Sequence, residues 1–230
     1  TAMGKVKRTS LKLFQNVNRA GIIAIDLNEG DELIGVTSTT GRDHLLLGTR
    51  HGMSIRFNED DARAMGRTAA GVKGIDLSDD DRVVGLVRIE MASEDDGDAA
   101  DPDLALLTVT ENGYGKRTTL SEYLVQSESE SGEVSYRAQS RGGKGRIDIR
   151  TTDRNGLVVA VRAVTEEEGV VFVTRDGLLV RTPAAQISLI GRNTQGVRVV
   201  NLKEGDKLIG AAVTPPSDEE GDEEASDEAV

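Results

Sequence analysis

The sequence predicts an all-β protein built from propeller-like blades, because one pattern of glycines, an arginine and short apolar runs occurs four times. The pattern opens with a glycine that is followed four residues later by an arginine, and these glycines are Gly4, Gly52, Gly113 and Gly177. A second glycine introduces a run that ends on Ile/Val, Asp/Asn and Leu/Ile, and we place it at Gly21, Gly71, Gly143 and Gly196. A period of about 50 to 65 residues with several short strands per unit is typical of propeller blades.

Each repeat is expected to contain about four antiparallel strands. The second repeat shows them most clearly, as alternating or apolar runs at 44–50, 53–57, 71–77 and 82–89. A tight turn separates the first two runs, which are therefore expected to form a hairpin. The four repeats cover approximately 1–40, 41–92, 104–165 and 168–213. Residues 1–213 are thus predicted to form one multi-blade domain.

The remaining segments are predicted to lack regular strands. No long helix is expected, and residues 62–65 and 121–124 form turns at most. Residues 126–133 are polar and are predicted to form a loop. The acidic tail, residues 214–230, has two prolines directly after Thr214 and is expected to be disordered.

The composition excludes several functional classes. The chain has no cysteine, which rules out disulfides and thiolate chemistry. No apolar stretch approaches the ~18 residues of a membrane span, so we expect a soluble, cytoplasmic protein, with no metal or cofactor of its own. His44 and His51 lack the partners of a catalytic pattern. Asp26, Asp76 and Asp148 recur at what we take to be one repeat position, which indicates blade architecture, so no catalytic residue is assigned.

The charge is unevenly distributed. The net charge is −12, from 28 Lys and Arg against 40 Asp and Glu. Eight acids lie in 217–230 and seven in 90–103, without a base in either segment, which leaves 25 acids against 28 bases elsewhere. The blades are therefore about neutral to slightly basic, which permits a polyanionic partner. With eight Lys against twenty Arg, the acid-rich composition resembles proteins from a high-salt cytoplasm; an ordinary acidic bacterial protein is the alternative.

The repeated arginine is the first candidate for nucleic-acid contact. It stands at Arg8, Arg56, Arg117 and Arg181. In its strand Arg56 alternates with Ile55 and Phe57, so it is expected to point to the opposite face. Such cations on successive blades, two of them beside Lys7 or Lys116, would offer phosphate contacts, which position a protein without reading sequence. The alternative is a solvated strand face with weak ion pairs.

A second basic set lies around the second glycine of each repeat. Its members are Arg19, Arg67, Lys73, Arg141, Lys144, Arg146, Arg192 and Arg198. Within it, the segment Q-S-R-G-G-K-G is the most distinctive local motif, and it consists of Gln139, Ser140, Arg141, Gly142, Gly143, Lys144 and Gly145. Its glycines would let the backbone approach a partner closely, while Arg141 and Lys144 supply charge to phosphates.

These motifs resemble the C-terminal domain of the DNA gyrase A subunit, which folds as a β-pinwheel. The resemblance rests on G-K-V-K-R-T at 4–9, A-M-G-R-T-A-A-G-V-K-G-I-D-L at 64–77 and I-G-R-N-T-Q-G-V at 190–197. Residues 139–145 resemble the family's box motif, Q-R-R-G-G-K-G, with Ser140 in place of one arginine. In the family the box belongs to the first of usually about six blades. The resemblance thus implies that this chain, which does not begin with Met, is part of a larger domain, whose true box is either upstream or at 139–145.

The resemblance also implies a function. The domain would bind and wrap double-stranded DNA, and the ATP- and Mg-using remainder of the gyrase A subunit, together with the gyrase B subunit, would introduce negative supercoils. The family's cleavage tyrosine lies in an N-terminal domain, so Tyr114, Tyr123 and Tyr136 do not take that role. Two alternatives stay open: the corresponding domain of the topoisomerase IV A subunit, and a propeller scaffold whose arginines bind an acidic partner protein. The acidic tail is either a competitor for the basic surface or a solubilising segment.

Overall fold

The computed structural model describes residues 1–91, 102–128, 132 and 134–216. The predicted disorder of the acidic tail falls mostly on 217–230, outside the described residues. The described strands are β1 (Lys5–Val6), β2 (His44–Thr49), β3 (Met53–Asn58), β4 (Val72–Lys73), β5 (Val83–Ile89), β6 (Ala105–Thr110), β7 (Tyr114–Thr119), β8 (Val125–Glu128), β9 (Val134–Arg137), β10 (Arg146–Ile147), β11 (Val158–Val164), β12 (Gly169–Thr174), β13 (Leu179–Pro183), β14 (Val197–Arg198) and β15 (Leu208–Thr214). The described 3₁₀ helices are η1 (Leu11–Phe14), η2 (Glu59–Asp61), η3 (Leu120–Tyr123) and η4 (Ala184–Gln186).

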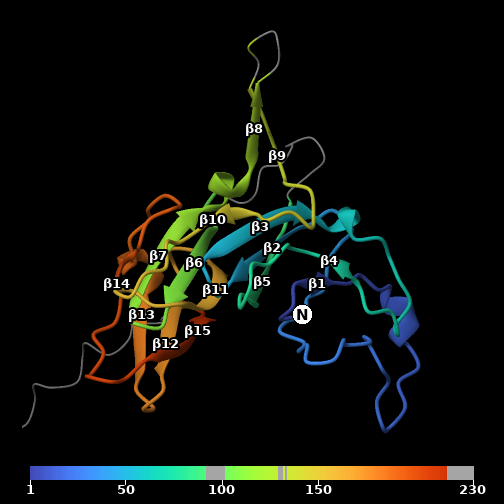
Figure 1. Cartoon of the computed structure of the whole chain (residues 1–230), viewed down its shortest axis with the longest axis horizontal. Helices are drawn as coiled ribbons and strands as arrows, with labels where there is room; N and C mark the ends of the chain where they lie inside the picture. Colours follow the sequence, from blue (N-terminus) through green and yellow to red (C-terminus); the bar gives the residue numbers. More distant parts are fainter. Residues whose placement is uncertain (92–101, 129–131, 133, 217–230) are drawn as a thin grey trace, which may run out of the picture.

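The strands form small antiparallel sheets that follow one another along an arc, from the N-terminal repeat to β15 (Figure 1). Two sheets have four strands, in the orders β10-β3-β2-β5 and β11-β6-β7-β14, and a third has the order β13-β12-β15. Two further pairs, β1 with β4 and β8 with β9, complete the described sheets. The predicted all-β, blade-based architecture is confirmed.

The outermost strand of a blade comes from the next repeat. Thus β4 pairs with β1, β10 with β3 and β14 with β7, each across a repeat boundary. At the opposite edge of the blades, β11 contacts both β5 and β15. Neighbouring blades are therefore joined by an exchanged strand on the outside and by packing on the inside. We call the outer side, formed by β4, β10, β14 and the loops that lead into them, the rim.

Each exchanged strand is fixed by the same pair of backbone hydrogen bonds. The carbonyl of Gly52 accepts the N–H groups of Asp148, at 2.9 Å, and Ile149, at 3.2 Å. The other two joints repeat this pair, from Gly74 and Ile75 to Gly4 and from Val199 and Val200 to Gly113. Gly52 has φ +85°, and a Cβ there would lie 2.1 Å from the carbonyl oxygen of Ile149. The first glycine of the repeat is thus required by the close approach of the next repeat.

The hydrophobic core is divided among the joints between blades. One cluster packs Leu46 and Ile89 of the second repeat against Leu106 and Val161 of the third, and all four are almost completely buried. Two similar clusters lie at the preceding and the following joints. Several small cores of Val, Ile and Leu agree with the scarcity of aromatic residues in the sequence. They also cover both faces of the central strands, so that all six residues of β6 are buried.

The first repeat departs from the expected pattern. Residues 21–27 and 31–36 form no strand, and Ile23 and Val36 are 64% and 81% exposed. In the second, third and fourth repeats the counterpart of 21–27 pairs with the blade before it. Within the described residues no preceding blade lies beside 21–27. The backbone of this segment therefore lacks the strand partner that holds the corresponding segments of the other repeats in an extended conformation.

Two smaller expectations are corrected. The turn predicted at 62–65 lies earlier, as η2, whereas η3 agrees with the turn predicted near 121–124. The predicted loop 126–133 begins too early, because 126–128 belong to β8, which pairs with β9 in a hairpin that projects from the blades (Figure 1). Across the described chain, no helix is long and apolar enough to cross a membrane, and no group of His, Cys, Asp and Glu could hold a metal ion.

Candidate nucleic-acid interface

The four blade arginines do not form an exposed ring. The side chain of Arg56 is completely buried, and Arg117 is only 3% exposed. Arg56 donates from Nε to Nδ1 of His44, at 3.1 Å, and from Nη1 to the carbonyl of Leu120, at 3.0 Å. Alternation does place Arg56 opposite Ile55, but that face is covered by the next repeat and not by water. The prediction that Arg56 and Arg117 reach phosphates from an exposed strand face is therefore wrong for this structure.

The repeated arginine joins one blade to the 3₁₀ helix of the next. Arg8 pairs with Glu59 and Asp60 in η2, and Arg56 reaches Leu120 in η3. Arg117 donates from Nε to the carbonyl of Ile187, directly after η4, at 2.9 Å. Arg181 is exposed and donates to the carbonyl of Pro215, at 3.0 Å. Repetition of this arginine thus follows from a repeated joint.

Lys116 is also buried, contrary to the prediction that it contacts DNA. Its Nζ lies 3.2 Å from Oδ1 of Asp148 and donates to the carbonyls of Asp148 and Gly191. The hydroxyls of Tyr123 and Thr108 donate to the same carboxylate, both at 2.6 Å. Burial lowers the pKa of Lys116, against the opposing charge of Asp148. This cluster fastens two neighbouring repeats together.

The amine of Lys7, outside this cluster, likewise donates to backbone carbonyls of two segments.

Three loops of equal length lead into the exchanged strands. They span 65–71, 139–145 and 190–196, and we call them the rim loops. The first residue of each donates its N–H to the backbone carbonyl of the repeated arginine in the preceding repeat, namely Met65 to Arg8, Gln139 to Arg56 and Ile190 to Arg117. The last residue of each is a glycine with positive φ that lies against the preceding blade, namely Gly71, Gly145 and Gly196.

The repeat pattern indicated Gly143 as the counterpart of Gly71 and Gly196. The structure places Gly145 at that position instead. The predicted register of the third repeat is wrong by two residues, because the segment offers three glycines within four positions. For the same reason Asp148 is not the counterpart of Asp76. Asp148 is buried, whereas the side chain of Asp76 is 42% exposed.

An arginine occupies the third position of every rim loop and is held by a backbone carbonyl. The acceptor always lies two residues after the second glycine of the preceding repeat. Arg67 donates to the carbonyl of Ile23, Arg141 to that of Lys73 and Arg192 to that of Ile147. Neutral carbonyls fix the direction of a guanidinium without cancelling its charge. Arg192 alone of these three also has a carboxylate within ion-pair distance among the described side chains, Glu122 at 3.6 Å.

The exchanged strands add further cations to the same side. They carry one each, Lys73 on β4, Arg146 on β10 and Arg198 on β14, and Lys144 in the second rim loop is exposed. Lys73 pairs with Asp76, at 2.8 Å, with both side chains largely in water. We call the seven residues Arg67, Lys73, Arg141, Lys144, Arg146, Arg192 and Arg198 the rim cations.

The box-like segment bridges two neighbouring parts of the rim. Gly142 donates its N–H to the carbonyl of Gly74, at 2.7 Å, and the carbonyl of Gly143 accepts the N–H of Asp76, at 2.8 Å. Oε1 of Gln139 is 3.4 Å from the N–H of Arg56, and Ser140 is exposed. The glycines of this segment therefore serve contact with the preceding exchanged strand, and the segment occupies the same place as the other two rim loops.

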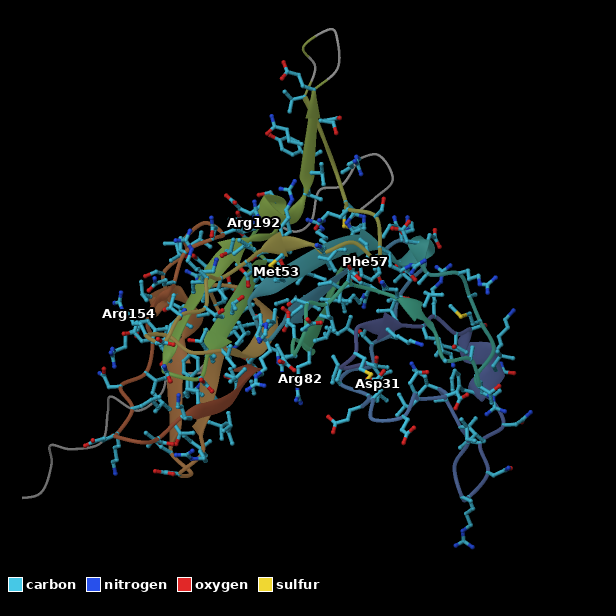
Figure 2. All side chains as sticks on the ribbon, in the orientation of Figure 1. Asp31, Met53, Phe57, Arg82, Arg154 and Arg192 are labelled. Carbon is cyan, nitrogen blue, oxygen red and sulfur yellow. The ribbon has the colours of Figure 1, made fainter. Side chains whose placement is uncertain are left out.

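Sequence reasoning missed a group of residues around Tyr114. Arg154 donates from Nε and Arg198 from Nη2 to the hydroxyl of Tyr114, at 3.2 and 2.9 Å. Both guanidinium carbons lie over its ring, at 5.2 and 5.0 Å from the centroid. The hydrogen bond from Arg154, above all, lowers the pKa of Tyr114. Figure 2 shows Arg154 at the outer margin of the blade that β7 and β14 build. The sequence signal for this group was the aromatic residue Tyr114 directly after the first glycine of its repeat, where two other repeats have Met53 and Leu178.

Comparison with known proteins identifies the family of the chain. The sequence profile of a family described as the DNA gyrase C-terminal domain, a beta-propeller, matches residues 1–40, 43–90, 105–134, 132–165 and 170–215. The chain belongs to this family. The matched segments of the gyrase domain follow the four repeats, with the third repeat matched in two parts around the β8–β9 hairpin.

Relatives and solved structures support the same assignment. The DNA gyrase A subunit of Haloquadratum walsbyi is 45% identical over 95% of this chain, and that of Salmonella typhimurium is 43% identical over 96%. The chain spans 23% and 22% of these two proteins. A solved DNA gyrase A C-terminal domain matches with a TM-score of 0.73 and 26% identity, over 93% of this chain and 63% of the other. The C-terminal domain of DNA topoisomerase IV shares the fold, with a TM-score of 0.79 and 21% identity over 93% and 60% of the two chains.

Proposed function

We propose that this gyrase domain binds double-stranded DNA without sequence selection along its rim and bends the duplex around the blades. The observation that carries the proposal is the repetition of the rim cations at successive joints. Three of them are guanidiniums held by carbonyls, so their positive charges stand at fixed intervals on a curved surface. Phosphate contacts of this kind set the path of a duplex but do not read its bases.

Wrapping requires several spaced contacts along the rim. Smooth bending of 20 to 30 base pairs costs about 1–6 kcal/mol, which several spaced contacts must offset. Each phosphate that is neutralised releases counterions and contributes about 0.9 to the slope of log affinity against log salt. Arg56, Lys116 and Arg117 do not belong to the proposed contact set because they are buried. Lys7, Arg8 and Arg181, which are engaged within the protein, are secondary members.

In the whole protein, the domain would set the direction of supercoiling. The relatives are gyrase A subunits, of which this chain corresponds to less than a quarter. The cleavage chemistry and ATP hydrolysis are therefore proposed to belong to the rest of the gyrase A subunit and to the gyrase B subunit, in a cytoplasmic assembly of two copies of each. A DNA segment wrapped with one sense around the rim would present a crossing of fixed sign to that machinery.

The test is binding of the protein to a nicked plasmid that is then religated, across a salt series. We expect affinity to fall steeply with salt and the linking number to shift in one direction. A triple variant of Arg67→Gln, Arg141→Gln and Arg192→Gln should lower the salt slope by about 3 and remove the shift. Its control carries Arg42→Gln, Arg82→Gln and Arg175→Gln, which remove three exposed charges away from the rim loops. Binding without a linking-number shift would reduce the function to a DNA clamp, and no binding at low salt would favour the protein scaffold.

A further inference from the structure

Tyr114 begins β7, in the blade whose outer strand is β14. Arg198 is its cross-strand partner in that pairing, so the exchanged strand of the fourth repeat places this guanidinium over a ring of the third. Arg154 reaches the same ring from the loop before β11. The side-chain amide of Asn112 donates to the carbonyls of Asp153 and Arg154, at 3.1 and 3.2 Å, and fixes that loop. Two arginines from different repeats thus converge on one side chain that is 5% exposed.

The charges of this cluster are not compensated. Within the part of the chain that the structure describes, neither Arg154 nor Arg198 has a carboxylate at ion-pair distance, and both are exposed. A tyrosine hydroxyl has one proton to donate and two lone pairs. The Tyr114 hydroxyl accepts a bond from each arginine, and within the described residues its own proton has no acceptor. The cluster therefore presents two guanidiniums and one O–H donor to a ligand that must be an anionic acceptor.

We propose that Tyr114, Arg154 and Arg198 form a binding site for a single phosphate group of the DNA backbone. This inference rests on the proposed function and assigns to one blade a contact that the other described blades do not repeat. A phosphate has several oxygens that accept hydrogen bonds, and arginine forks match its geometry. Arg67, Arg141 and Arg192 are each held by a backbone carbonyl, whereas here two guanidiniums are held together on one tyrosine against their repulsion. The duplex would be fixed in register at this point of its path.

The first measurement is the salt dependence of duplex DNA binding by Arg154→Gln, Arg198→Gln and the double variant. Removing a phosphate contact lowers the slope by about 1. Because the two arginines share one phosphate, either single variant should weaken binding with little change in slope, and the double variant should lower the slope by about 1. Tyr114→Phe keeps both charges and should weaken binding without changing the slope. Arg175→Gln, at a side chain that is 59% exposed, is the matched control. In the double variant, an unchanged slope or a loss of about 2 would overturn the site while leaving DNA binding intact.

The second measurement separates the site from the proposed function. The ring resonances of ¹³C-labelled tyrosine are followed while inorganic phosphate is added without DNA. Tyr114 should move saturably in the wild type and stay still in the double variant. Tyr136, exposed on β9, and the buried Tyr123 are internal references that should not move. If Tyr114 does not respond, the site is wrong even where DNA binds; if it responds although DNA does not bind, the site stands and the wrapping function fails.

Discussion

The blade arginines show how one residue type supports a repeated joint. Arg56 is completely buried yet satisfied, because its donors meet His44 and a carbonyl of η3. An arginine has five donors in a planar fork, which suits a joint lined by carbonyls better than a lysine would. Burying the charge of this arginine costs desolvation free energy. Removing the side chain costs more, because the acceptors around it are then left without hydrogen-bond donors.

Replacing Arg56 by methionine should therefore destabilise the fold and leave DNA affinity unchanged. We expect a loss of about 3 kcal/mol in the free energy of unfolding, from buried acceptors that lose their donor. Urea unfolding gives the stability, and a DNA titration at a temperature where the variant is folded gives the affinity. Arg67→Gln on the rim should behave in the opposite way, with a small stability change and weaker binding. A drop in affinity for folded Arg56→Met would return this residue to the DNA interface.

Asp43 makes stability depend on acid pH. Its carboxylate is buried and lies 2.6 Å from Nε of Arg88. Burial raises its pKa, but the hydrogen bonds from Arg88 and Thr40 outweigh this, and the net shift is downward. A carboxyl with a lowered folded pKa contributes stability above its unfolded pKa, near 3.9, and loses it as pH falls through the folded value.

The free energy of unfolding should thus decline between about pH 5 and pH 2 by more in the wild type than in Asp43→Asn. The amide removes the titrating group and keeps the shape of the side chain. Denaturant titrations at several pH values measure both curves, and Asp79→Asn, in an exposed turn, is the control. Parallel curves for wild type and Asp43→Asn would show that another group controls the acid transition.

At the level of elements, the exchanged strand is what makes the blades one molecule. β4, β10 and β14 each have two residues, too few to hold a sheet edge alone. Their position depends on the glycine carbonyl that accepts two N–H groups in each joint. The joint therefore depends on the absence of a side chain at the first glycine of the repeat.

Gly52→Ala and Gly177→Ala should separate conformational strain from the joint itself. Both glycines have positive φ, +85° and +86°, which costs an alanine about 1–2 kcal/mol. At Gly52 the new Cβ would also meet the carbonyl of Ile149, whereas at Gly177 nothing lies within 4 Å. We expect Gly177→Ala to lose about that amount and Gly52→Ala at least twice as much, by thermal or urea unfolding. Equal losses would mean that the exchanged strand moves away without cost.

The sequence predicts the strands of the second, third and fourth repeats, because their hairpins are local and their apolar runs are regular. The sequence cannot show that β10 pairs with β3 of the preceding repeat and not with a strand of the third repeat. A two-residue strand is too short to have a pattern that predicts its partner. The same limit explains the error at Gly143, where three glycines fit the motif. Alternation gave the correct face for Arg56 but not what covers that face. Tyr114 and Arg154 meet only through a turn fixed by Asn112, which no spacing reveals.

At the scale of the molecule, opposite charges are kept in different regions. The rim cations recur along the arc, while fifteen of the forty acids lie in residues 90–103 and 217–230. This distribution leaves 28 bases against 25 acids in the rest of a chain whose net charge is −12. It also puts an acidic segment on the same chain as the proposed DNA-binding rim. Occupation of the rim by that segment would compete with DNA.

Deletion of residues 217–230 should therefore tighten DNA binding. The deletion removes eight acids and no base, so part of the competition with phosphates is lost. Exposed charge pairs are worth about 0.2–1 kcal/mol each, and a few of them would give roughly a fivefold tighter binding at low salt. The gain should vanish near 1 M salt, where the screening length is about 3 Å. A variant with the acids of 217–230 replaced by their amides keeps the length of the segment and should match the deletion. Affinity that is unchanged in both variants at low salt would make the segment a solubilising one.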